Sequence, residues 1–148
     1  MQLGASLPVG DIGTGPAPLR DYAQAAEGLG YTYLLAPDHV LGGNPGVDYG
    51  GKRVGTTATA YHDPFVLFAF LAGVTKKMGF ASGVIILAQR QAALVAKQAA
   101  CLDELCEGRF RLGIGVGWNE IEFQGLGMDF HTRGKRSAEQ VRLSLIHI

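Results

Sequence analysis

The sequence has few of the features that mark secreted or membrane-spanning proteins. Its 2 cysteines, Cys101 and Cys106, stand five positions apart on a predicted helix and therefore on different faces. We expect buried free thiols in a reducing compartment. The N-terminus has no basic segment followed by a long apolar one, and no apolar run elsewhere reaches membrane-spanning length. We therefore expect a soluble, cytoplasmic protein.

An excess of charge of either sign is also lacking. Thirteen basic residues balance 13 acidic ones, and the basic residues form no run. This argues against partners such as nucleic acid or an anionic membrane surface and favours a small molecule. The histidines, cysteines and carboxylates show no metal-ligand spacing, so we predict no metal site. A Gly-x-Ser-x-Gly nucleophile motif is missing as well.

What the sequence does have is a regular alternation of strand and helix patterns. Strands are predicted at 2–7, 31–36, 78–87 and 110–114, and helices at 19–29, from Pro64, at 91–106 and at 132–142. Without a hairpin signal, this alternation predicts an α/β protein with a parallel sheet. Periodicity does not separate a barrel from an open doubly wound sheet, but both bind ligands at the carboxyl ends of their strands.

One stretch, 107–120, joins a helix to a strand and continues into a candidate site. Gly108 is suited to end the helix, and Gly115 and Gly117 after the strand allow a close approach of the backbone to a ligand. Trp118 then offers a flat apolar face and Asn119 an amide. The spacing is not the dinucleotide fingerprint. The alternative is that these glycines only relieve crowding between the strand and its neighbours.

A second candidate site follows the strand at 31–36. His39 titrates near neutrality and Asp38 can orient it, which suits a proton-handling pair. The alternative is that Asp38 caps a turn and His39 is an ordinary strand-end histidine. The glycine-rich stretch 42–61 is predicted to be a lid, a binding loop or disordered. Asp63 and Pro64 are predicted to cap and begin the next helix.

Several spaced motifs resemble those of the bacterial luciferase-like monooxygenase superfamily, and within it most closely the coenzyme F420-dependent oxidoreductases. The matching segments are Asp38-His39-Val40, Asp63-Pro64-Phe65, Ser82 to Leu87, Ala96 to Asp103 and Gly108 to Asn119. The resemblance implies a (β/α)8 TIM barrel with a deazaflavin cofactor at the carboxyl ends of the strands. Since a full barrel needs about 200 residues or more, we expect residues 1–142 to be its N-terminal half, truncated after about four βα units.

The resemblance also implies roles for particular residues. Asp38 and His39 would lie beside the redox-active ring as catalytic residues, and a non-prolyl cis peptide at Gly83–Val84 would lie behind it; the alternative there is a β-bulge. The implied cofactor-binding residues are Asp38, His39, Gly83, Val84, Gly115, Gly117, Trp118 and Asn119. Trp118 stands where sugar-phosphate dehydrogenases of the superfamily carry a glutamate, which disfavours that reaction and suggests an apolar substrate pocket.

We therefore expect hydride transfer between coenzyme F420 and an organic small molecule. The alternatives are an FMN-dependent monooxygenase and a non-catalytic, ligand-binding half-barrel. Glu120 and Glu122 are predicted to be first-turn helix residues favoured by the helix dipole. For the complete protein we expect a homodimer. Residues 143–148, Leu-Ser-Leu-Ile-His-Ile, depart from the family's continuing helix and match the translation of a transposon end used in sequencing libraries, so we expect a non-native tail there.

Overall fold

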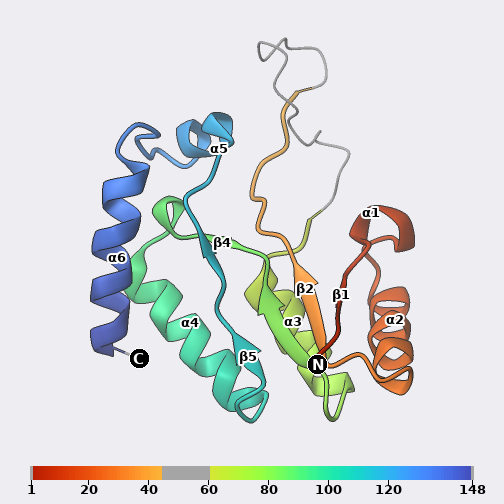
Figure 1. Cartoon of the computed structure of the whole chain (residues 1–148). Coiled ribbons are helices and arrows are strands. Elements are labelled where there is room, and N and C mark those ends of the chain that lie inside the picture. Colours follow the sequence, from red (N-terminus) through yellow and green to blue (C-terminus); the bar gives the residue numbers. More distant parts are fainter. Residues whose placement is uncertain (1, 45–60, 148) are drawn as a thin grey trace.

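The structure is a computed structural model that describes residues 2–44 and 61–147. Strands β1 (Gly4–Ser6), β2 (Tyr33–Ala36), β3 (Gly79–Ser82) and β5 (Phe110–Arg111) form a parallel sheet in that order. Strand β4 (Ile85–Ile86) continues β3, and β6 (Ile114–Gly115) continues β5; these two also pair in parallel (Figure 1). The predicted α/β class with a parallel sheet is confirmed.

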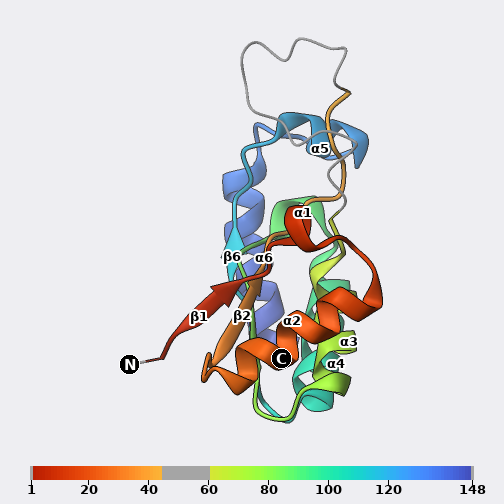
Figure 2. The ribbon, with the colours of Figure 1, turned by 90° about the vertical axis from the view of Figure 1, so that its right-hand side faces the viewer.

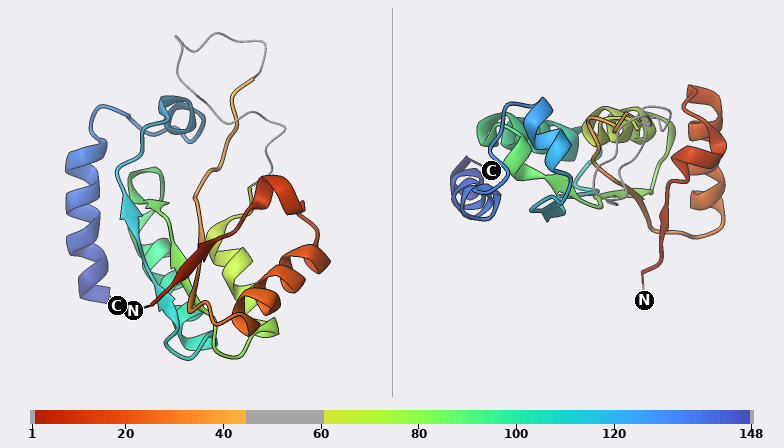
Figure 3. Two further views of the ribbon diagram at one scale, coloured as in Figure 1. Left: turned by 45° about the vertical axis from the view of Figure 1, so that its right-hand side comes forward. Right: turned by 90° about the horizontal axis from the view of Figure 1, so that it is seen from above.

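The helices lie along one side of this sheet, as Figures 1 and 3 show for α2, α3 and α4. Because the strands follow each other in space in their sequence order, the arrangement is that of a singly wound barrel rather than a doubly wound sheet. The helical segments are α1 (Val9–Ile12), α2 (Pro16–Gly28), α3 (Pro64–Val74), the 3-10 turn η1 (Leu87–Gln89), α4 (Ala92–Leu105), α5 (Glu120–Gly125) and α6 (Arg133–His147). Within the described ranges, none of these helices is long and apolar enough to cross a membrane.

The helix boundaries follow the predicted signals closely. An oxygen of the Asp63 carboxylate accepts hydrogen bonds from the backbone N–H groups of Phe65, at 2.9 Å, and Val66, at 3.2 Å, so Asp63 is the N-cap of α3. Gly30 and Gly108, which follow α2 and α4, have φ angles of +86° and +77°. Glycine adopts this left-handed conformation without a steric penalty, which suits both positions just past the helix ends; after α4, Glu107 is left-handed as well, with a φ of +56°.

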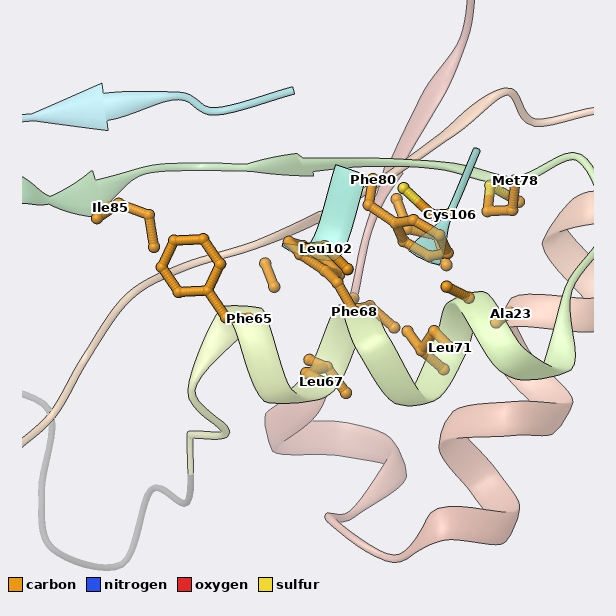
Figure 4. Close-up of a cluster of buried hydrophobic side chains, with 14 of the residues drawn as sticks. Ala23, Phe65, Leu67, Phe68, Leu71, Met78, Phe80, Ile85, Leu102 and Cys106 are labelled. Atoms are coloured by element: carbon orange, nitrogen blue, oxygen red, sulfur yellow. The ribbon is translucent and has the colours of Figure 1, made fainter. Parts of the chain in front are cut away.

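The main hydrophobic core lies between the sheet and the helices (Figure 4). Phe68 and Leu71 of α3 and Phe80 of β3 are completely buried, and the rings of Phe68 and Phe80 are 5.3 Å apart. Helical spacing in the sequence predicts that Leu94, Val95, Gln98, Leu102 and Leu105 share one inward face of α4, which is wrong in part because Leu94 and Leu105 are 53% and 71% exposed. The buried face of α4 is instead made of Ala92, Val95, Ala96, Ala99 and Leu102. These residues have helical spacing, and their small side chains let α4 lie close to its neighbours.

The third and fourth strands are each interrupted at the same level. The Gly83–Val84 peptide between β3 and β4 is cis, as predicted from the resemblance. Beside it, the Ser82 hydroxyl donates to the carbonyl of Gly113 and accepts from its N–H, both at 2.9 Å, so a side chain bridges the gap in the backbone ladder.

Glycines in the fourth strand make room for the third. A Cβ atom at Gly113 would collide with the backbone oxygen of Ser82, and one at Gly115 with the side chain of Val84. A Cβ atom at Gly117, whose φ is +82°, would lie 2.6 Å from Ile86. The crowding interpretation of these glycines therefore accounts for their positions, and the predicted contact of Gly115 and Gly117 with a cofactor stays a prediction.

Candidate active site

The two candidate sites of the sequence meet at one end of the sheet. Ala36 at the end of β2 pairs in register with Ser82 at the end of β3, and Ile86 of β4 pairs with Gly115 of β6. The residues that follow these strands, including His39, Val84 and Trp118, therefore all lie at the carboxyl edge. Figures 1 and 2 show this edge near α5, which follows β6. In parallel α/β folds this is the edge where ligands bind.

Asp38 is bound to Arg90 rather than to His39, so the predicted Asp38–His39 pairing is wrong. Its carboxylate is 3% exposed and accepts hydrogen bonds from Arg90 Nη2 at 2.6 Å, from Arg90 Nε at 3.0 Å and from the N–H of Ile86 at 3.0 Å. Arg90 also donates to Asp63 Oδ2 at 2.8 Å. A guanidinium can donate two parallel hydrogen bonds to one carboxylate, whereas an imidazole can donate only one. This explains why the buried carboxylate of Asp38 is bound by Arg90 and not by His39.

This ion network joins three parts of the chain. Asp38 follows β2, Arg90 follows η1, and Asp63 caps α3. Burial lowers the pKa of Arg90, but the hydrogen bonds and charges of the two carboxylates outweigh burial and raise that pKa. The guanidinium therefore stays charged, and the network fixes the backbone from which the next residue, His39, projects.

The partner of His39 is Glu122 of α5. His39 Nδ1 lies 3.2 Å from Glu122 Oε1, and the carboxylate is almost completely buried, at 1% exposure. The same oxygen accepts the backbone N–H groups of Val40, at 3.0 Å, and Leu41, at 3.3 Å. Gln89 Nε2 lies 3.5 Å from the second oxygen, Oε2. Glu122, which the sequence predicted only as a first-turn residue favoured by the helix dipole, therefore lies at the centre of the site.

The two members of this pair shift each other's titration. The hydrogen bond and charge of Glu122 raise the pKa of His39 above its ordinary 6.5, against the opposing effect of burial. Burial alone would raise the pKa of Glu122, but the hydrogen bond and charge of His39 and two backbone N–H groups outweigh it and lower the pKa below the ordinary 4.5. The imidazolium–carboxylate form is therefore favoured at mildly acidic pH.

The directions of these two pKa shifts determine how the stability of the fold depends on pH. Because the pKa of His39 is raised on folding, its contribution to stability is full below pH 6.5 and is lost as the pH rises through the folded-state pKa. Because the pKa of Glu122 is lowered, its contribution is full above pH 4.5 and is lost as the pH falls through the folded-state pKa. The stabilising contributions of His39 and Glu122 are therefore both complete only between pH 4.5 and pH 6.5.

Aromatic and apolar side chains surround the imidazole. The ring of Tyr61 lies 4.8 Å from the His39 ring, and the Trp118 ring lies 6.3 Å away in an edge-on arrangement. Trp118 is 52% exposed and Val84 is 37% exposed, so both present apolar surface at the carboxyl edge. The structure thus brings together the predicted residues His39, Val84 and Trp118.

Two buried polar side chains at this edge are incompletely satisfied. Gln89 and Asn119 are each 4% exposed, and among the described residues neither Gln89 Oε1 nor Asn119 Oδ1 has a hydrogen-bond donor. Asn119 precedes α5 but its side chain does not cap the helix. Buried acceptors of this kind usually bond to water or to a ligand.

Glu122 and Arg90 are the site residues that the sequence analysis missed. Arg90 carried no motif of its own. For Glu122 there was a weak signal, because it stands next to the aromatic residue Phe123 shortly after the predicted strand 110–114. The structure buries Phe123 completely in the short helix α5. Most of the predicted loop 42–61 lies outside the described residues. Across residues 2–44 and 61–147 no group of three histidines, cysteines or carboxylates is arranged to hold a metal ion.

The parallel strands in sequence order, with helices along one side, form part of a barrel and place the chain in the TIM-barrel class of α/β folds. The comparisons with known proteins identify the family within it. The model of the luciferase-like monooxygenase family matches residues 2–145. The chain therefore belongs to the luciferase-like monooxygenase family, whose members are oxidoreductases.

The relatives are longer than this chain. An uncharacterized protein of Mycobacterium tuberculosis is 35% identical over 127 residues, which are 82% of this chain and 44% of that protein. The pyrimidine monooxygenase RutA of Allorhizobium ampelinum is 29% identical over 139 residues, 86% of this chain and 35% of that protein. The chain thus spans less than half the length of these relatives.

Solved structures confirm the barrel fold. The oxygenating constituent of 3,6-diketocamphane monooxygenase from Pseudomonas putida, in complex with FMN, superposes with a TM-score of 0.78 at 20% identity, over 97% of this chain and 38% of that one. The coenzyme F420-dependent tetrahydromethanopterin reductase from Methanopyrus kandleri has a TM-score of 0.62 at 22% identity, over 87% of this chain and 30% of that one. The chain forms part of a luciferase-like TIM barrel.

Proposed function

We propose that the complete protein is an oxidoreductase that transfers a hydride between coenzyme F420 and an organic small molecule. The observation that carries the proposal is the group formed by His39, Val84 and Trp118 at the carboxyl edge, with His39 held by a buried carboxylate. Membership of the luciferase-like family supports the oxidoreductase class. The choice of F420 rests on the resemblance of the motifs at Asp38-His39 and Gly108 to Asn119 to those of F420-dependent enzymes.

The residues present fit a planar, uncharged ring. Val84 and Trp118 expose apolar surface, and the oxygens of Gln89 and Asn119, which have no donor among residues 2–44 and 61–147, are acceptors for ring N–H groups or for water. Val84 and Trp118 would therefore hold the ring system of the cofactor. When bound, F420 supplies a ring carbon that accepts or gives a hydride.

His39 would move the proton that accompanies hydride transfer. Its Nδ1 atom is committed to Glu122, whereas Nε2 makes no hydrogen bond to the described residues. The side chain keeps 24% of its surface exposed, and Nε2 would give a proton to the substrate oxygen or remove one. Asp38 would act indirectly, by fixing the backbone next to His39 through Arg90.

The substrate would be at least partly apolar. Trp118 offers an indole face, and an indole does not act as the acid that a sugar-phosphate dehydrogenase needs at this position. Apolar contact with half-exposed Trp118 favours substrates with a ring or an aliphatic segment next to the reacting carbon.

An FMN-dependent monooxygenase is the second candidate. Two similarities favour it: the RutA relatives are named pyrimidine monooxygenases, and the Pseudomonas putida structure with the TM-score of 0.78 contains FMN. The apolar surface of Val84 and Trp118 suits either ring system, so the fit of the ring does not separate the two cofactors.

The test is equilibrium dialysis of the complete protein, as its gene encodes it, against F420 and against FMN. We expect saturable binding of F420 at micromolar concentrations and much weaker binding of FMN. The Trp118→Ala variant should weaken F420 binding by about fivefold, since aromatic stacking contributes on the order of 1 kcal/mol. Tight binding of FMN without binding of F420 would replace the proposal by the monooxygenase candidate.

We also propose that residues 1–142 are the N-terminal half of the barrel domain and that 143–148 are not native. The coverage of less than half of the relatives supports the first part. The second part rests on the match of 143–148 to the translated transposon end, although the family match extends to residue 145 and α6 to His147. Amplifying the gene from its source without transposon tagging and reading the codons after Arg142 tests it. A reading frame that stops directly after Ile148 would support the third candidate, a non-catalytic half-barrel.

A further inference from the structure

We infer that Glu122 is a positioning residue of the reaction: it selects the tautomer of His39 and ties the imidazole to the first residues of the segment that follows β2. The inference rests on the proposed role of His39 in proton transfer. The sequence analysis had assigned Glu122 only an interaction with the helix dipole.

The geometry of one oxygen atom carries the argument. Glu122 Oε1 is shared by His39 Nδ1, at 3.2 Å, and by the N–H groups of Val40, at 3.0 Å, and Leu41, at 3.3 Å. Three donors from consecutive residues meet a single carboxylate oxygen from a helix more than 80 positions away in the sequence. At 1% exposure the carboxylate has no access to bulk water that could replace these donors. Any rotation of Glu122 would therefore disturb the imidazole and its backbone together.

The chemistry of the carboxylate fixes the tautomer. An ionised carboxylate only accepts hydrogen bonds, so Nδ1 must carry the hydrogen that points to it. In the neutral imidazole the lone pair is then on Nε2, which is the nitrogen without a hydrogen bond to the described residues. A general base needs its lone pair on the nitrogen that reaches the substrate. Glu122 thus makes Nε2 the reactive nitrogen.

The other groups around His39 leave this role to Glu122. The carboxylate of Asp38 is engaged by Arg90 and by the N–H of Ile86. Its charge raises the pKa of His39 less than the contact with Glu122 does. Tyr61 contacts the imidazole through its ring, and Trp118 has no ionisable group. The pKa of His39 should therefore respond mainly to the charge of Glu122.

The experiment is a pH titration of the ¹⁵N-histidine-labelled complete protein by NMR, without cofactor. Three histidines of residues 1–142, His39, His62 and His131, contribute signals together with any in the remainder of the complete protein, and the His39→Asn variant assigns those of His39. Glu122→Gln keeps an acceptor oxygen of the same shape but removes the charge, whereas Glu122→Ala removes both. Glu139→Gln, at an exposed position of α6, is the control for the loss of one negative charge.

In the wild type we expect the neutral imidazole of His39 to carry its hydrogen on Nδ1. Glu122→Gln should keep that tautomer and lower the pKa of His39 towards its ordinary value, since the stabilising charge is lost. Glu122→Ala should abolish the tautomer preference and speed hydrogen exchange at the amides of Val40 and Leu41. Glu139→Gln should change neither quantity. If the variant Glu122→Ala does not fold, the pKa of His39 in Glu122→Gln alone tests the inference.

The turnover of the enzyme provides a separate readout. In Glu122→Gln the limb of the pH–rate profile that reports His39 should move to lower pH, and kcat should fall by about 10–100-fold, the usual effect of losing an orienting partner. An unchanged pKa of His39 in Glu122→Gln, or an unchanged tautomer preference in a folded Glu122→Ala, would overturn the inference whichever cofactor binds. The expected NMR changes in a protein that binds neither cofactor would instead overturn the proposed function and leave the positioning of His39 standing.

Discussion

Replacing His39 with asparagine in the complete enzyme should lower kcat by about 10²–10⁴-fold, the usual contribution of a general acid or base. Asparagine is similar in size and retains an amide N–H that can reach Glu122, so the hydrogen bond at 3.2 Å has a substitute. What it removes is the group that titrates near neutrality. The dissociation constant for the cofactor should change little, because Val84 and Trp118 supply the apolar contact. Stopped-flow measurement of hydride transfer, together with dialysis, separates the two effects.

His131→Asn is the matched control for this substitution. His131 is exposed and lies in the turn before α6. It should leave kcat within twofold of the wild type. A His39→Asn enzyme with normal kcat and an unchanged pH–rate profile would remove His39 from the chemistry and reduce it to a packing residue.

Asp38→Asn should lower the free energy of unfolding by about 3 kcal/mol, the lower end of the cost of breaking a buried ion pair. The amide cannot accept both hydrogen bonds from Arg90 with the strength of a carboxylate, and it leaves the guanidinium with Asp63 as its remaining charged partner. The lower end applies because the Arg90 side chain is 15% exposed and keeps that second contact. Urea denaturation of the complete protein measures the change.

The surface pair Arg20–Asp21 provides the comparison. Its side chains are 45% and 63% exposed, so Asp21→Asn should alter the unfolding free energy by about 0.5 kcal/mol or less. Equal losses from Asp38→Asn and Asp21→Asn would show that the buried network does not hold the carboxyl edge together.

Most of the fold was predictable because its signals are local. Asp63 and Pro64 mark the start of α3 by their own chemistry, and Gly30 and Gly108 mark helix ends because the backbone there has positive φ. The parallel sheet followed from the order of the elements. The buried face of α4 was less predictable, since Leu94 and Val95 are equally apolar and only the neighbouring elements determine which is covered.

The site was predictable only where its residues directly follow strands. His39, Val84 and Trp118 occupy such positions, and the strand register brings them to one edge. Their partners were not predictable in the same way. The contacts of Asp38 with Arg90 and of His39 with Glu122 join residues 52 and 83 positions apart. Nothing in the local sequence indicates which of two carboxylates, Asp38 or Glu122, an imidazole will contact once the strands are assembled.

Trp118 allows the most direct test of whether the carboxyl edge is the cofactor site, because it is the single tryptophan of the chain and is 52% exposed. The measurement is a fluorescence titration of the complete protein with F420, with the Trp118→Phe variant used to isolate the emission of Trp118. We expect saturable quenching of that emission, with a midpoint equal to the dissociation constant obtained by dialysis. Saturable binding of F420 that leaves the emission of Trp118 unchanged would place the cofactor elsewhere and contradict the assignment of the site.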